Sequence, residues 1–295
     1  MTDARVATCR SCVLAALLAA LLAGPVPAQE EAAPQEPAPP AEEPAEEPTE
    51  EPAEESAERD PLGTRLIDTA TPFPVGARMW ELLFTHRFQQ TVQDGSSHDL
   101  WGLDGAADVG IGMTFGLTRR LDLGLYRSSF QEDYEVFGKL LLLEQKRRVP
   151  LSVAVRAGVD RLEREGVADP TRPFAQLIVV RRFGRGVNLL VAPSWVGETT
   201  RLSDAMNVPV GLTVPLPHSR LLELEVVPAN RDLDDSITAW HVGFSHDVGR
   251  HIFEVVLGNS RATTVDQMLG SDFPPGFAED DVRLGFNLIR LFPLF

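Results

Sequence analysis

The sequence predicts an all-β fold, an up-and-down antiparallel transmembrane β-barrel of about 12 strands that is preceded by a disordered linker. Three observations predict this fold. The last strand-like stretch alternates apolar and polar residues and ends near a terminal Phe295, which is typical of outer-membrane barrels. The chain starts with an export signal and has no apolar run long enough for a spanning helix. Alternation with a period of two recurs from about residue 77 onward.

Residues 1–28 have the composition of a secretory signal peptide, with basic residues ahead of an apolar run over 13–22. The run is about half of the roughly 20 residues that a membrane-spanning helix needs, so we expect cleavage after Ala28. Both cysteines of the chain, Cys9 and Cys12, lie in this segment. They have no second pair with which to form a metal or redox site, so we expect neither.

Residues 29–60 are a low-complexity linker of Glu, Pro and Ala, in which 13 acidic residues stand against one Arg. Proline at about every fourth position blocks a helix and the carboxylates repel one another, so we expect disorder. The linker is either a tether for a basic periplasmic protein partner or a solvated spacer, and charge runs are usually spacers. The acidic sign and the export signal both disfavour nucleic acid as a partner.

Residues 61–295 form the predicted outer-membrane β-barrel. The expected strands are 77–89, 104–117, 120–128, 133–145, 150–161, 173–183, 186–197, 205–215, 219–228, 236–247, 251–259 and 281–292. Most are close to the 9 to 11 residues of a tilted membrane strand. Tight joints alternate with mostly longer ones, which is the asymmetry of outer-membrane barrels, and an even strand count returns both ends to the periplasmic side. We therefore expect the bacterial outer membrane as the location, with the linker in the periplasm.

One face of the expected strands is apolar, whereas the other carries charged residues and glycines. A secreted β-sandwich or lipocalin-like barrel also alternates, but it turns its apolar face inward. We therefore expect the charged face to line a lumen. The lumen-facing candidates are Glu81, Arg87, Asp108, Asp122, Glu135, Lys139, Arg156, Asp160, Glu223, Glu225, Glu254 and Arg283. The expected C-terminal barrel signal consists of Phe286, Leu288, Phe292 and Phe295.

Several short motifs follow one another along residues 64–295. They are Thr64-Arg-Leu-Ile67, Thr85-His-Arg-Phe88, Trp101-Gly-Leu-Asp104, Phe115-Gly-Leu-Thr118, Arg127-Ser-Ser-Phe130, Leu257-Gly-Asn-Ser260 and Leu284-Gly-Phe-Asn-Leu-Ile-Arg290. In this order they resemble a bacterial outer-membrane β-barrel family catalogued only as a domain of unknown function. The resemblance implies a barrel in the outer membrane and supplies no substrate, cofactor or catalytic residue. The acidic linker and the last tripeptide depart from the family pattern.

The sequence contains no local catalytic motif. His241 and Ser245 share a strand face, but four residues of strand separate them by about 13 Å, which is too far for a catalytic pair. His246 and His251 flank a turn, and even with Asp247 they make a weak metal site. We therefore expect a protein that is not an enzyme, with no catalytic residues, no metal and no cofactor.

The predicted function is a porin-like passage or transport component for a small solute whose identity is unknown. The alternative is a non-conducting barrel that anchors or docks a periplasmic partner through its acidic linker. The expected partners are outer-membrane lipid and the barrel-assembly machinery. The inward charges either pair across strands and plug the lumen, or they line a water-filled passage whose acidic excess favours cations.

Overall fold

The computed structural model describes residues 62–163, 171–199, 201–234, 236–269 and 281–294. The predicted signal peptide and linker lie outside these residues. The strands are β1 (Met79–Phe88), β2 (Ala107–Gly116), β3 (Leu121–Ser128), β4 (Asp133–Leu143), β5 (Ser152–Leu162), β6 (Thr171–Arg182), β7 (Asn188–Val191), β8 (Ser194–Gly197), β9 (Asp204–Asn207), β10 (Val210–Leu216), β11 (Arg220–Val227), β12 (Ala239–Val248), β13 (His251–Gly258) and β14 (Arg283–Pro293). The short helices are η1 (Leu100–Gly102), η2 (Phe130–Glu132), η3 (Gly184–Gly186) and α2 (Val265–Met268).

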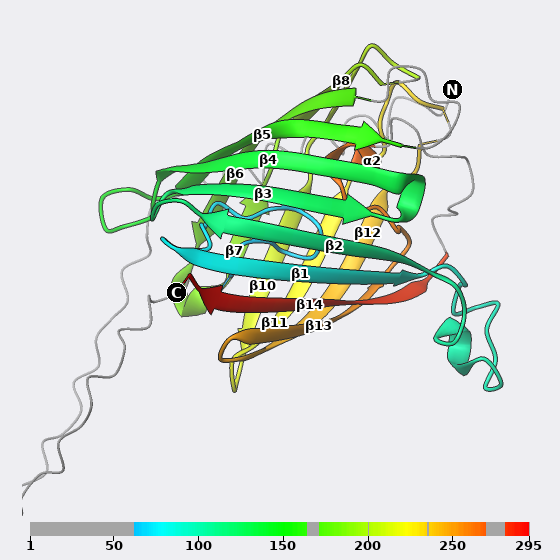
Figure 1. The fold of residues 1–295 in the computed structure, drawn as a ribbon. Helices are drawn as coiled ribbons and strands as arrows, with labels where there is room; N and C mark the ends of the chain where they lie inside the picture. The colour runs from blue at the N-terminus through cyan, green and yellow to red at the C-terminus, as the bar shows by residue number, and fades with distance from the viewer. Residues whose placement is uncertain (1–61, 164–170, 200, 235, 270–280, 295) are drawn as a thin grey trace, which may run out of the picture. The chain divides into compact units, whose positions relative to one another are not determined.

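The strands form one antiparallel sheet that closes on itself (Figure 1). β1 pairs with both β2 and β14, so the first and last strands of the chain lie side by side, and the pairing of β5 with β6 belongs to the same ring. Among the described residues, no helix has both the length and the apolar character needed to cross a membrane.

Two strands of the ring are interrupted by proline. β7 and β8 both pair with β6 and are separated by Ala192 and Pro193, whereas Val208 and Pro209 separate β9 from β10. Proline has no N–H to donate to the ladder, so the pairing breaks there and resumes in the same direction. Counted as continuous strands, the closed barrel has twelve, which confirms the predicted fold and strand number.

The barrel wall has its charged face inward and its apolar face outward. Asp122 and Asp160 are fully buried, whereas their sequence neighbours Leu123 and Val159 are exposed. The exposed set includes Ile111, Met113, Leu123, Leu125, Val136, Leu177, Val255 and Leu257. A soluble barrel has the opposite distribution, because its interior is the apolar core. The outer face instead matches the lipid-facing band of a membrane barrel.

Two segments of the chain fold into the lumen. The first, which we call the N-terminal plug, comprises residues 62–76 and precedes β1. The second, which we call the inward loop, comprises residues 259–269 and includes α2. Both are buried over most of their length, and Figure 1 shows α2 and the coil ahead of β1 within the ring of strands.

Apolar residues of the two plugging segments pack against the inner face of β6 to β9. Leu62, Leu66 and Phe73 of the N-terminal plug form one buried cluster with residues of β6 and β7, including Ile178 and Leu190. A second cluster joins inward-loop residues to β6, β8 and β9. Its members are Ala262, Val265, Met268, Leu269, Phe174, Val196 and Ala205. This side of the lumen is therefore a packed core, and the charges lie mainly on the other strands.

The two plugging segments enter from opposite ends of the barrel. Connections of two to five residues join β2 to β3, β6 to β7, β10 to β11 and β12 to β13 at one end, which is also where β1 begins and β14 ends. The N-terminal plug leaves the lumen at this short-turn end, where Arg78 N–H donates to the Gly116 carbonyl. The inward loop follows β13 and therefore enters from the long-loop end.

The expected strand boundaries differ from the observed ones by up to three residues. Residues 77 and 78 precede β1 because the backbone turns at Gly76 and Arg78, which have positive φ values of 110° and 60°. The adjacent arginines in the expected strand 173–183 mark its end, since β6 stops at Arg182. Arg182 bonds the Asn188 side chain, and its guanidinium lies over the Phe73 ring of the plug.

Candidate functional site

The candidate site is the lumen, where the structure buries all twelve of the predicted lumen-facing residues. They are Glu81, Arg87, Asp108, Asp122, Glu135, Lys139, Arg156, Asp160, Glu223, Glu225, Glu254 and Arg283. A buried charge is costly unless it is paired or hydrogen-bonded. Most of these residues find partners in the N-terminal plug or the inward loop.

The N-terminal plug contacts charged residues on both sides of the lumen through Asp68. Arg87 on β1 donates to Asp68 Oδ1 at 2.8 Å, and Glu225 on β11 accepts the N–H groups of Asp68 and Thr69 at 3.1 and 3.0 Å. The plug turns sharply at this point, because Leu66 N–H donates to Thr69 O at 2.8 Å and Thr71 N–H to Thr64 O at 2.9 Å. The turn therefore presents backbone donors and one carboxylate to the wall.

The plug also satisfies charges on β1, β3 and β4. Thr64 Oγ1 lies 2.7 Å from both carboxylate oxygens of Glu81. Asp122 accepts the Val75 N–H at 3.2 Å, and Lys139 Nζ donates to the Phe73 carbonyl at 2.6 Å while lying 3.4 Å from Asp122. These wall charges are therefore compensated by plug backbone as well as by one another.

The inward loop compensates the buried charges of β4, β5 and β6. Glu135 accepts the Val265 N–H at 3.0 Å and also pairs with Arg156. Asp266 of α2 donates its N–H to Asp160 at 3.2 Å and accepts from Arg172 at 3.2 Å. A helix of this length leaves its first N–H groups without intrahelical partners, and wall carboxylates take two of them.

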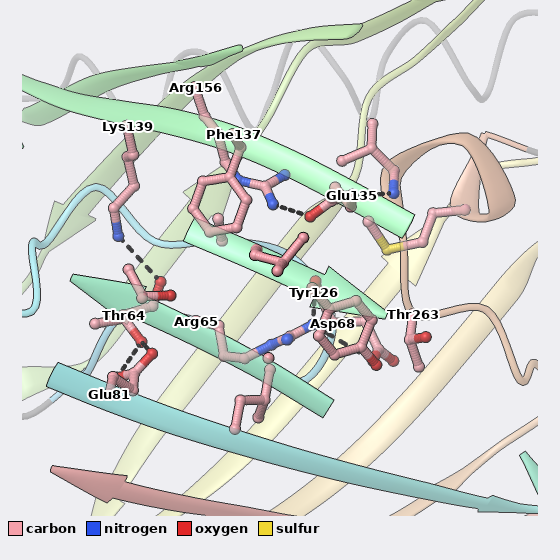
Figure 2. A pocket seen from close by; sticks show the side chains of 17 residues that line it. Thr64, Arg65, Asp68, Glu81, Tyr126, Glu135, Phe137, Lys139, Arg156 and Thr263 are labelled. Carbon is pink, nitrogen blue, oxygen red and sulfur yellow. Dashed lines mark hydrogen bonds and ion pairs between the residues drawn. The ribbon is translucent and has the colours of Figure 1, made fainter. Parts of the chain in front are cut away.

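A small cavity remains between the two plugging segments (Figure 2). It has a volume of about 50 Å³, which suits a few water molecules. Arg65 of the plug projects into it beside Asp68 and Tyr126. Burial lowers the pKa of the Arg65 guanidinium, but neighbouring groups, Asp68 first among them, outweigh burial and raise the pKa above its ordinary value. Arg65 is therefore charged at neutral pH.

A larger hollow of about 400 Å³ lies at the long-loop end of the barrel. Its lining residues are Gln89, Asp108, Ser129, Phe130, Gln131, Glu132 and Arg261. Arg261 of the inward loop donates to Asp108 at 2.5 Å, so the hollow lies where the inward loop meets the wall.

The remaining predicted residues have local partners. Glu223 accepts from Ser245 at 2.6 Å, Glu254 accepts from Asn287 at 2.7 Å, and Arg283 pairs with Asp281 at 2.9 Å. Of the expected C-terminal signal, Phe286, Leu288 and Phe292 lie partly exposed on β14, and Phe295 falls outside the described residues. Their role in barrel assembly stays a prediction.

Sequence reasoning missed several residues that complete the site, namely Asp68, Asp133, Arg172, Asp266 and Asn287. Asp133 and Arg172 follow the same two-residue alternation as their neighbours Glu135 and Gln176, so strand parity predicts their inward orientation. The plugging residues lie outside the strands and give no such signal.

The histidines considered from sequence have separate partners. His241 Nε2 lies 3.2 Å from the Ser260 carbonyl, whereas Ser245 donates to Glu223. His246 is opposite Phe253 in the sheet, and His251 is opposite Val248.

Two other groups in the described parts of the chain have metal-ligand spacing. One is Asp68 with Glu225 and His241, and the other is Asp133 with Asp160 and Asp266.

The end of the plug depends on a close approach to β2 at Gly116. A Cβ built there would lie 1.8 Å from the Gly76 carbonyl oxygen. We expect Gly116→Ala to lower the thermal unfolding midpoint of the barrel by several degrees, because backbone must move to relieve the overlap. Gly184→Ala is the matched control, since nothing lies within 4 Å of its Cβ position. Equal midpoints for the two variants, measured by circular dichroism, would contradict this packing.

A family comparison agrees with this geometry. Residues 62–292 match the model of a membrane-bound β-barrel domain, DUF5777. The chain belongs to this family. The match begins at the first residue of the N-terminal plug, so the plug is part of the family domain, and it confirms the resemblance inferred from the sequence motifs. No curated protein sequence matches the chain.

Solved structures of similar fold are outer-membrane barrels. An outer membrane channel from Pseudomonas putida F1 has a TM-score of 0.45 and 12% identity, with 74% of this chain and 96% of that chain covered. Outer membrane phospholipase A from Escherichia coli has a TM-score of 0.39 and 12% identity, with 74% and 93% covered. An anion-selective porin from Comamonas acidovorans has a TM-score of 0.37 and 10% identity, with 72% and 98% covered.

One sequence-based prediction is corrected by this comparison. We expected a protein that is not an enzyme, yet enzyme barrels, the outer membrane phospholipases, are among the similar structures. The absence of a local motif is a poor guide here, because a catalytic pair can be assembled from different strands. At 12–13% identity the likeness extends to the fold alone and does not make this chain an enzyme.

Proposed function

We propose that this protein is a gated passage for a small solute in the bacterial outer membrane, held closed by its own N-terminal plug. The observation that carries the proposal is the partnering of the lumen charges. Wall residues such as Glu225, Asp122 and Lys139 bond to the plug backbone. A wall with this many charges is suited to water once the plug moves away.

The closed state follows from the space that the plugging segments occupy. The cavity between them holds about 50 Å³, which is smaller than a typical solute site of a few hundred Å³. The hollow of about 400 Å³ beside Asp108 and Arg261 is large enough to receive a small polar molecule. We therefore infer that a solute first meets the barrel at the long-loop end.

The predicted linker gives the plug a mechanical connection. Residues 29–60 precede the plug in the sequence by one residue, and we propose that they lie in the periplasm. A periplasmic protein that pulls on this acidic segment would act directly on residues 62–76. The barrel-assembly machinery and outer-membrane lipid remain the other expected partners.

The proposal is tested by locking the plug with a reversible cross-link. A Cβ atom built at Gly211 would lie 2.1 Å from Leu66 Cδ2. Cysteines at positions 66 and 211 should therefore have their Cβ atoms at about the 3.5–4.5 Å separation that a disulfide bond requires. The native cysteines, Cys9 and Cys12, lie in the predicted signal peptide. We expect Leu66→Cys/Gly211→Cys to show no channel openings in planar bilayers when the disulfide is formed. After reduction, the variant should show the same openings as the protein without the two substitutions.

Unchanged openings in the fully cross-linked protein would contradict gating by the plug. A folded protein that never conducts in either redox state would favour the alternative, a barrel that anchors a periplasmic partner.

A further inference from the structure

Three side chains of the lumen converge where the N-terminal plug touches β11 and β12. Asp68 belongs to the plug, and Glu225 and His241 are directly opposite each other on the two strands. Each offers one ligand atom, and the three ligand atoms lie within 4.8 Å of one another. All three residues are at least 96% buried, with exposures of 4%, 1% and 3%.

Each of these residues has one polar atom without a hydrogen-bond partner. The three atoms are Asp68 Oδ2, Glu225 Oε1 and His241 Nδ1. Buried polar atoms are normally satisfied, so three such atoms side by side without hydrogen-bond partners form a setting that suits a bound cation. Asp68 Oδ2 and His241 Nδ1 are 3.6 Å apart, which is too long for a hydrogen bond between them.

The other polar atom of each residue is held in place by the surrounding protein. His241 Nε2 lies 3.2 Å from the Ser260 carbonyl, which can only accept, so Nε2 carries a proton and Nδ1 is the nitrogen that faces the two carboxylates. Asp68 Oδ1 is bound by Arg87, and Glu225 Oε2 by two plug N–H groups. Ligands of metal ions are oriented in this way by outer hydrogen bonds.

Acidic groups outnumber guanidinium groups around the three ligand atoms. The acidic groups are Asp68, Glu225, Glu223 and Glu254, and the guanidinium groups are those of Arg65 and Arg87. Glu254 adds a further buried oxygen without a hydrogen-bond partner, Oε1. A cation bound among these oxygens would offset part of the cost of burying them.

We propose that Asp68, Glu225 and His241 bind a divalent transition-metal ion, with Zn²⁺ as the first candidate. Two carboxylate oxygens and one imidazole nitrogen form a donor set that suits zinc and related ions. Because Asp68 is on the plug and the other two ligands are on the wall, the ion would clamp the plug in the lumen. The proposed metal site follows from the distances between the ligand atoms and from their burial, so it is independent of whether the barrel conducts ions.

The test measures zinc bound to the full chain, folded in detergent, by equilibrium dialysis against ZnCl₂ and elemental analysis. We expect one Zn²⁺ per chain, a thermal unfolding midpoint that falls by several degrees when a chelator removes the ion, and Co²⁺ spectra with a nitrogen ligand. His241→Ala should weaken binding by about 100-fold or more. The matched control is His246→Ala, a half-buried residue on the same strand that should bind zinc normally.

Asp68→Asn provides a second variant, because it removes a ligand charge from the plug and leaves the wall strands unaltered. We expect it to weaken zinc binding to a similar degree. Absence of bound zinc and cobalt in the folded full chain would overturn the proposal. Equal zinc binding by the full chain, His241→Ala and Asp68→Asn would also overturn it, because the ion would then lie elsewhere.

Discussion

Deletion of residues 62–76 should convert the closed barrel into a steadily conducting one, with current about tenfold or more above that of the full chain. The plug fills the part of the lumen that the inward loop does not occupy, so its removal should leave a water-filled path along the twelve-stranded wall. The twelve predicted lumen residues comprise eight acids and four bases, so the current should favour cations. Single-channel recording in planar bilayers, with reversal potentials in a salt gradient, measures both quantities.

A deletion of residues 29–60 that keeps the plug is the control, and it should remain closed. Far-ultraviolet circular dichroism and heat-modifiable gel migration show whether each variant has folded as a barrel. A folded plug-deleted barrel without conductance would contradict the passage and favour the anchoring alternative.

Replacement of Arg87 by Met should lower the free energy of unfolding by about 3–5 kcal/mol. Arg87 is 2% exposed and donates to Asp68 Oδ1 and Asn287 Oδ1, both at 2.8 Å. Without it the Asp68 carboxylate loses its closest cation in a buried site, and the plug loses an ion pair with β1. Urea unfolding of the barrel in lipid vesicles, followed by tryptophan fluorescence, measures the loss.

Arg161→Met is the matched control, because Arg161 pairs with Glu163 at the surface, where the side chains are 56% and 49% exposed. Its effect should stay below about 1 kcal/mol. The double variant Arg87→Met/Asp68→Asn should recover part of the lost stability, since the unpaired charge is gone. Equal losses for the two single arginine variants would contradict a buried ion pair at Arg87.

Strand periodicity predicts the wall of this barrel from sequence because lipid and lumen impose opposite demands on alternate residues. Glu81 and Arg87 lie inside and Leu82 is exposed, as their positions predict. Proline breaks such as Pro193 and Pro209 divide strands without changing the count. The order of the strands in the chain and the short turns between them then specify which strands pair with each other in the barrel.

The contents of the lumen could not be predicted in the same way. Asp68 meets Glu225 across 157 positions of sequence, and Asp266 meets Asp160 across 106. Neither contact follows from a local pattern, because the plug and the inward loop are irregular segments whose position depends on the closed wall. The apolar residues between Leu62 and Val75 give a partial signal, since a solvated spacer would not contain them.

The most direct test of the account is the yield of the disulfide between Leu66→Cys and Gly211→Cys in native membranes. The position of the plug predicts near-complete cross-linking, detected as a linked peptide by mass spectrometry. Leu66→Cys/Gly184→Cys is the control and should not cross-link, because the space around Gly184 is open. Free thiols at both Leu66→Cys and Gly211→Cys, without the linked peptide, would show that residues 62–76 do not occupy the lumen and would contradict the account.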